Sequence, residues 1–116
     1  MTISREEYEF LNNPEKAIAN WLIKHNITFD TQVPLFGIGE LGSATVDFIL
    51  TERNVAIRAM GRYWHTGLEV NARDLLGREK LTERGFTVVD VWEENLAPDR
   101  VNNTLELAIQ GLEVIR

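Results

Sequence analysis

The sequence predicts a single α/β domain in which a mixed β-sheet is flanked by helices. The expected order of elements is helix, three strands, helix, strand, helix. A three-residue connection between the second and third strands suits an antiparallel hairpin. The last strand follows a helical crossover, so we expect it to pair parallel to an earlier strand. At 116 residues and 44% hydrophobic composition, the chain is long and apolar enough for one domain with one core.

The first helix is predicted at residues 13–26. Residues 1–12 are expected to be an N-terminal arm, either loose or a short helix, ahead of a domain over residues 13–116. Asn13-Pro14 predicts the helix start, with Asn13 as N-cap and Pro14 in the first helical position. An apolar stripe along this helix indicates the face that meets the sheet. It consists of Ala17, Ile18, Trp21 and Leu22.

Three strands are predicted next, at residues 27–35, 44–51 and 55–60. Pro34 marks an edge or a bend at the end of the first. The glycine-rich segment 37–42 leads into a strand rather than a helix, so it is not a nucleotide-binding glycine loop.

The second half of the domain is predicted to contain two helices and one strand. A loop over residues 61–70 precedes a helix at 71–84, which Gly85 caps at its C-terminus. Residues 86–92 are almost continuously apolar and β-branched, which predicts a strand buried on both faces. A final helix is expected over roughly residues 99–110.

The composition of the chain excludes several kinds of functional site. The chain has no cysteine, which excludes disulfides, thiolate zinc sites and cysteine nucleophiles. No apolar run approaches membrane-spanning length, and the N-terminus does not resemble a signal peptide. The net charge of −6 argues against indiscriminate nucleic-acid binding. Residues 53–84, however, carry seven basic and four acidic side chains, which predicts either a nucleic-acid contact surface or a solvated helix face of mixed charge.

Asp47 is the first candidate for chemistry, because it is a charge in the middle of an apolar strand. A buried carboxylate needs compensation, and a metal ion or a functional pocket commonly supplies it. The alternative is a structural ion pair with Arg58 on the adjacent strand.

Several short motifs carry a resemblance to a known family. They are Val46-Asp47-Phe48, Tyr63-Trp64-His65, Arg73-Asp74, Leu81, Gly85 and the strand over residues 88–92. With these motifs, the chain from Pro14 to about Gly111 resembles the restriction-endonuclease-like superfamily. Within it, the very-short-patch-repair endonuclease branch is most similar, together with phage homing endonucleases that share a Glu, Asp, x, His, Asp signature.

The signature maps onto the sequence in order as Glu15, Asp47, His65 and Asp74. One departure concerns the third strand, where Arg58 stands at the usual place of a metal-binding carboxylate and Met60 at that of a second acid or a lysine.

The resemblance implies a small DNA endonuclease or nicking enzyme that uses Mg²⁺, or Mn²⁺ in its place, to hydrolyse phosphodiester bonds. Asp47 and the backbone carbonyl of Ala59 would hold the metal. His65 would accept a proton from the attacking water, oriented by Asp74, while Glu15 would hold a water from the opposite side. DNA contacts are expected from arginines and aromatic residues. They are Arg58, Arg62 and Arg73 on phosphates, and Tyr63 and Trp64 stacked on or wedged between bases.

Each of these residues also has a structural interpretation. Glu15 suits the first turn of a helix, Asp74 suits a helix N-terminus, and His65 is otherwise a structural or surface histidine. Other residues are expected to be structural. Tyr63 and Trp64 are alternatively core, Trp21 and Trp92 are expected in the core, His25 is expected to cap its helix, Asp90 is expected to be a structural acid, and Met60 is expected to fill a gap.

For the whole chain, the alternative function is a catalytically inactive nuclease-fold module that serves DNA binding or protein assembly, as in a phage. The motivating features are Arg58, the short length and the acidic net charge. An active enzyme of this length is expected to be weakly specific, a homodimer, or guided by a protein partner. Its expected location is the cytoplasm of a bacterial or phage-infected cell.

Overall fold

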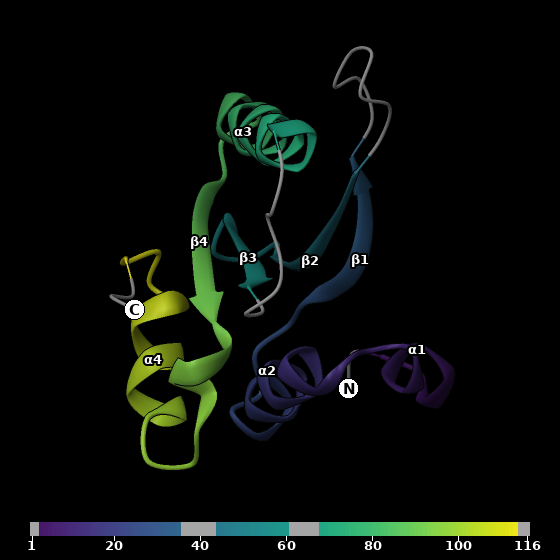
Figure 1. Cartoon of the computed structure of the whole chain (residues 1–116). Helices are drawn as coiled ribbons and strands as arrows, with labels where there is room; N and C mark the ends of the chain where they lie inside the picture. The colour runs from purple at the N-terminus through teal and green to yellow at the C-terminus, as the bar shows by residue number, and fades with distance from the viewer. Residues whose placement is uncertain (1–2, 36–43, 61–67, 114–116) are drawn as a thin grey trace.

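The computed structural model describes residues 3–35, 44–60 and 68–113, without the side chains of residues 35, 44 and 68–74. The main helices and strands follow the predicted order of helix, three strands, helix, strand, helix (Figure 1). In order they are α1 (Arg5–Glu9), α2 (Asn13–Lys24), β1 (Asp30–Leu35), β2 (Ala44–Leu50), β3 (Val55–Met60), α3 (Leu68–Glu83), β4 (Thr87–Trp92), a 3-10 turn η2 (Glu93–Leu96) and α4 (Val101–Ala108).

The four strands form one mixed sheet in the order β1-β2-β3-β4. The β1–β2 and β2–β3 pairs are antiparallel, and β3 pairs with β4 in parallel. The predicted mixed sheet with a parallel strand after a helical crossover is therefore confirmed. Asn54 has a φ of 54° in the turn between β2 and β3, a conformation that asparagine tolerates better than most residues.

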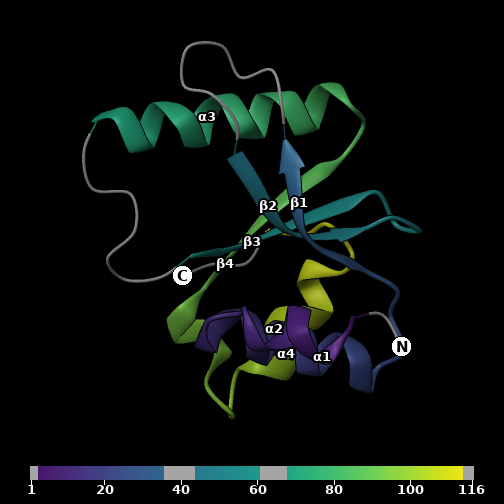
Figure 2. The same ribbon diagram turned by 90° about the vertical axis from the view of Figure 1, so that its right-hand side faces the viewer.

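Helices cover both faces of the sheet. In Figure 2, α3 lies across one face, while α1, α2 and α4 lie on the other. The larger hydrophobic layer is on the α2 and α4 side and includes Phe48, Leu50, Ile57 and Leu105, all fully buried. A smaller layer faces α3; its buried members are Val46, Ile49, Ala56 and Leu81.

The N-cap of helix α2 lies one residue earlier than predicted. It is Asn12 rather than Asn13, because the Asn12 side chain accepts the Glu15 N–H while Glu15 accepts the Asn12 N–H, each at 2.9 Å. His25 is the C-cap, as predicted.

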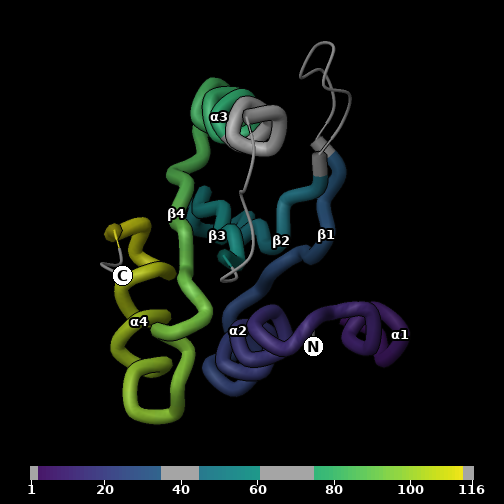
Figure 3. The backbone as a smooth tube through the Cα atoms, in the orientation of Figure 1, coloured from purple at the N-terminus to yellow at the C-terminus, as the bar shows by residue number. Residues whose placement is uncertain are grey.

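Buried Trp21 ties α2 to α4, which lie side by side in the backbone trace of Figure 3. Its indole N–H donates to Asn102 Oδ1 at 3.0 Å, and its ring stacks on His25 with centroids 3.8 Å apart.

The N-terminal segment contains α1, the short helix that was one of two alternatives for residues 1–12. Ser4 and Glu7 form a capping box at its start. Ile3 and Leu11, on either side of α1, are buried in the larger hydrophobic layer.

The helix predicted at residues 71–84 has a different start in the structure, but its end agrees with the prediction. Helix α3 begins at Leu68, three residues before the predicted start at Asn71. Its C-terminal end matches the prediction, because Gly85 has a φ of 92° and Phe86 N–H donates to the Leu81 carbonyl.

Strand β4 is fully buried on one face only. Val89 and Val91 are buried, whereas Val88, Asp90 and Trp92 are half-buried on the side of the smaller hydrophobic layer. Trp92 is therefore not the core residue that we expected. Among the described residues, no helix combines the length and the apolar character needed to cross a bilayer.

Candidate active site

Asp47 lies where β2 and β3 separate. The pairs between these strands are Phe48 with Ile57, Ile49 with Ala56 and Leu50 with Val55. Beyond this point Asp47 Oδ2 accepts a hydrogen bond of 2.8 Å from the Ala59 N–H. The carboxylate thus accepts the kind of hydrogen bond that a backbone carbonyl accepts within a strand ladder. The Ala59 N–H therefore keeps an acceptor where the β2–β3 ladder ends.

Glu15 reaches the same place from α2 and is 8% exposed. Its Oε1 accepts the Asn12 N–H, and its Oε2 accepts a hydrogen bond of 3.3 Å from Gln32 Nε2 on β1. Glu15 thus has a structural role in the capping box at the start of α2. The same side chain lies close enough to Asp47 to raise the pKa of that carboxyl group, so two acids from distant parts of the sequence converge.

The pKa of Asp47 is raised from 3.8 to about 7. Burial is the largest cause, since it disfavours the charged form, and the side-chain hydrogen bond and negative charge of Glu15 act in the same direction. The Ala59 N–H and the Arg58 guanidinium oppose the change by stabilising the carboxylate. Near neutral pH, Asp47 is therefore still partly protonated, whereas an exposed aspartate would have released its proton.

The pleat of β2 is irregular at Asp47. Val46 and Ile49 belong to the hydrophobic layer under α3, whereas Phe48 and Leu50 belong to the opposite layer. Regular alternation would place Val46 and Phe48 on the same face. The irregularity coincides with the hydrogen bond that directs Asp47 toward Glu15 rather than into the α3 layer.

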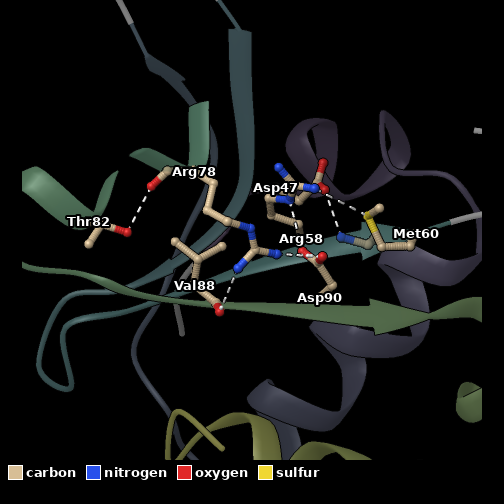
Figure 4. Close-up of polar contacts among 8 residues, drawn as sticks. Asp47, Arg58, Met60, Arg78, Thr82, Val88 and Asp90 are labelled. Atoms are coloured by element: carbon tan, nitrogen blue, oxygen red, sulfur yellow. Dashed lines mark hydrogen bonds and ion pairs between the residues drawn. The ribbon is translucent and has the colours of Figure 1, made fainter. Parts of the chain in front are cut away.

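Arg58 forms its ion pair with Asp90, its partner in the parallel register of β3 and β4. Arg58 Nε lies 2.9 Å from Asp90 Oδ1, and Arg78 of α3 binds Asp90 Oδ2 at 2.5 Å (Figure 4). Arg58 acts on Asp47 through its charge, which lowers the pKa of that carboxyl group. Asp90 is a structural acid, as predicted, and it joins two strands and a helix. Met60 is buried, and its sulfur accepts a contact of 3.8 Å from Arg58.

The structure brings together only part of the predicted site. Glu15, Asp47 and Ala59 are adjacent, with Arg58 near them. Four predicted residues lie outside the described residues, namely Arg62, Tyr63, Trp64 and His65. The backbone of Arg73 and Asp74 belongs to α3, but their side chains are also outside the described set. In the part of the chain that the structure describes, metal-binding side chains form no group of three or more.

Sequence reasoning missed two residues around the acids, Asn12 and Gln32, and the pairing of Arg58 with Asp90. Asn12 was detectable, because Asn12 and Glu15 have the spacing of a capping box. The Arg58–Asp90 pair follows once β3 and β4 are aligned in parallel. Gln32 carries no sequence signal, since glutamine predicts neither a strand irregularity nor a contact with a helix.

Comparison with known proteins adds evidence on the fold. No protein-family model matches the sequence, and no curated protein matches it. Among solved structures, "Homing Endonuclease I-Bth0305I Catalytic Domain" matches with a TM-score of 0.59 and 20% sequence identity, over 84% of this chain and 93% of that one. The α/β fold of this chain is therefore similar to that of a homing endonuclease catalytic domain.

Proposed function

We propose that this chain is a small metal-dependent DNA endonuclease or nicking enzyme of the very-short-patch-repair-like kind. The observation that carries the proposal is the pairing of Glu15 with Asp47 beside Ala59, in a fold similar to a homing endonuclease catalytic domain. Two acids that share a buried position at the end of a strand ladder are costly for stability, and such arrangements cluster at functional sites.

The residues at this position fit Mg²⁺ or Mn²⁺ by their donor atoms. Asp47 and Glu15 supply carboxylate oxygens, which hard divalent cations prefer. The N–H and C=O of one residue in an extended strand lie along the same edge, so the Ala59 carbonyl is on the edge where its N–H meets Asp47. A divalent cation between these oxygens would replace the proton of Asp47. When bound, it would neutralise charge on the scissile phosphate and favour ionisation of the attacking water.

The remaining roles follow the resemblance. His65 accepts the proton of the attacking water, and Asp74 orients His65. Arg58, Arg62 and Arg73 are assigned to phosphate contacts, and Tyr63 and Trp64 to contacts with bases. Arg58 is the arginine least suited to a phosphate contact, because its guanidinium already binds the Asp90 carboxylate.

The test is nicking of supercoiled, mismatched and branched DNA in Mg²⁺ or Mn²⁺. Asp47→Ala should abolish metal-dependent nicking, because it removes a metal ligand. His65→Ala should lower the nicking rate by at least about 100-fold, the typical contribution of a positioned acid–base group. Matched controls are Asp99→Ala at an exposed acid and His25→Ala at the helix cap, which should retain wild-type rates. Wild-type protein that leaves all three substrates intact with either metal would refute the proposal.

The second candidate is a catalytically inactive module that keeps the nuclease fold for DNA binding or for assembly with a protein. Arg58, in place of a third-strand carboxylate and paired with Asp90, is the observation that favours it. In that case DNA retention in a gel shift would be unaffected by Asp47→Ala, and Mg²⁺ or Mn²⁺ would not change the melting temperature.

A further inference from the structure

Gln32 has a backbone conformation that is unusual for its residue type. Its φ is 51°, in the left-handed region, although it lies between Thr31 and Val33 in the middle of β1. The other non-glycine residues with positive φ in the described chain are Asn26, after α2, and Asn54, in the β2–β3 turn. Asparagine tolerates this conformation, whereas a residue with a longer side chain is strained in it, and such strain clusters at functional sites.

The strained residue lies level with Asp47 on the neighbouring strand. The β1–β2 register pairs Thr31 with Phe48 and Val33 with Val46, so Gln32 and Asp47 occupy the interval between these two pairs. This is the same interval in which Val46 and Phe48 turn to opposite faces of the sheet. The backbone strain in β1 and the irregular pleat in β2 are therefore one local distortion.

The side chain of Gln32 also reaches the acids. Its Nε2 donates to Glu15 Oε2 at 3.3 Å, while the Asn12 N–H holds Glu15 Oε1. Both oxygens of Glu15 are thus fixed by donors. Its orientation relative to Asp47 is determined from α2 on one side and from β1 on the other.

We infer that Gln32 is a positioning residue for the Glu15–Asp47 pair. Its left-handed backbone produces the distortion that directs Asp47 toward Glu15, and its amide fixes the Glu15 carboxylate. The importance of this role for catalysis rests on the proposed function. The positioning itself can be measured without substrate. Gln32 needs no contact with metal or DNA to act in this way.

Two substitutions separate the backbone from the side chain. Gln32→Val opposes the left-handed conformation, because β-branched residues are outliers there. Gln32→Gly keeps that conformation and removes only the amide. Asn54→Val is the matched control, since Asn54 has nearly the same φ of 54° but lies in the β2–β3 turn, at the other end of the β2–β3 ladder from Asp47.

The first measurement is the NMR chemical shift of the Ala59 amide proton, which reports its hydrogen bond to Asp47 Oδ2. Gln32→Val should remove the downfield shift of that proton and weaken Mn²⁺ binding by about tenfold or more, as for a residue that orients metal ligands. Asn54→Val should lower the melting temperature to a similar extent and change neither quantity. Gln32→Gly should melt no lower than wild type and keep the Ala59 shift, but alter the ¹³C shift of the Glu15 carboxyl group.

Retention of the Ala59 shift and of Mn²⁺ affinity in Gln32→Val, with loss of stability alone as in Asn54→Val, would overturn the inference. If Gln32→Val does not fold, an unchanged Glu15 carboxyl shift in Gln32→Gly would overturn it instead. Failure of the proposed function is distinguishable, because wild-type protein would then bind no Mn²⁺ and cleave no DNA while the Ala59 and Glu15 shifts still report on Gln32.

Discussion

At the scale of single residues, Asp47 is central to the candidate site, and burial opposes its ionisation. In the folded protein the pKa of Asp47 is about 7, whereas an ordinary aspartate has a pKa of 3.8. The protonated Asp47 carboxyl group therefore makes its full contribution to the stability of the folded state below about pH 4. This contribution is lost as the pH rises through about 7. A pKa difference of this size corresponds to at most about 4 kcal/mol of unfolding free energy.

Asp47→Asn should consequently stabilise the protein at alkaline pH while it removes nicking activity. Asparagine is neutral at every pH, and its amide keeps an acceptor for the Ala59 N–H and a donor toward Glu15. The gain in urea midpoint over wild type should be small near pH 4 and grow toward about pH 8. Asp99→Asn, at an exposed acid, is the control and should show no such trend. A pH-independent difference for Asp47→Asn would contradict the assignment.

At the scale of elements, Asp90 joins β3, β4 and α3 through its two arginine partners. Asp90→Ala would leave the guanidiniums of Arg58 and Arg78 facing each other, and the Arg58 side chain is only 14% exposed. We expect a loss of about 2 kcal/mol in unfolding free energy, since charged hydrogen bonds of this kind are lost together. Urea unfolding at constant m-value would measure it.

Asp90→Asn should lose less, because the amide oxygen still accepts from one arginine. Glu83→Ala is the comparison at a weak ion pair, since Glu83 lies 3.8 Å from Lys80 and its side chain is 69% exposed. Equal effects of Asp90→Ala and Glu83→Ala would mean that the three elements do not depend on Asp90.

The sequence predicted those elements whose signals are local. Strand β3 was predicted with the residues at which it is found, because its apolar run is bounded by a polar turn and a glycine. Two neighbouring asparagines made the N-cap of α2 ambiguous, and only the hydrogen bonds distinguish Asn12. The start of α3 was missed because residues 68–70 adjoin a glycine and were assigned to the loop before Asn71.

The site was predictable only where it depended on residue order. Glu15 and Asp47 were expected together from the resemblance, and the structure confirms their proximity. The left-handed backbone of Gln32 was beyond prediction, because tertiary contacts impose a conformation that the residue itself disfavours. The roles of His65 and Asp74 stay predictions.

At the scale of the whole molecule, the two faces of the sheet differ in how much apolar surface they bury. Among the described side chains, the layer toward α2 and α4 contains most of the fully buried ones. In the part of α3 whose side chains are described, residues 75–83, Leu81 is buried, whereas Leu75 and Leu76 are substantially exposed. Segments with few buried contacts open at lower free energy than the global core.

Native-state hydrogen exchange should therefore find a lower opening free energy for the amides of α3, residues 75–83, than for those of β3 and α2. Leu81→Ala should accelerate exchange in α3 selectively, whereas Leu22→Ala, in the larger layer, should destabilise the whole domain by about 2–5 kcal/mol. Uniform protection across α3 and β3 would show instead that the domain opens as one unit.

The capping box at the start of α2 has a consequence for reading related sequences. Glu15 begins a helix and faces Asp47 with the same carboxylate, so a relative that has lost catalysis still needs an acid or amide there to keep its helix. The presence of Glu15 is thus poor evidence of activity. Asp47 is more diagnostic, because its burial lowers stability at neutral pH and an inactive descendant would gain by replacing it.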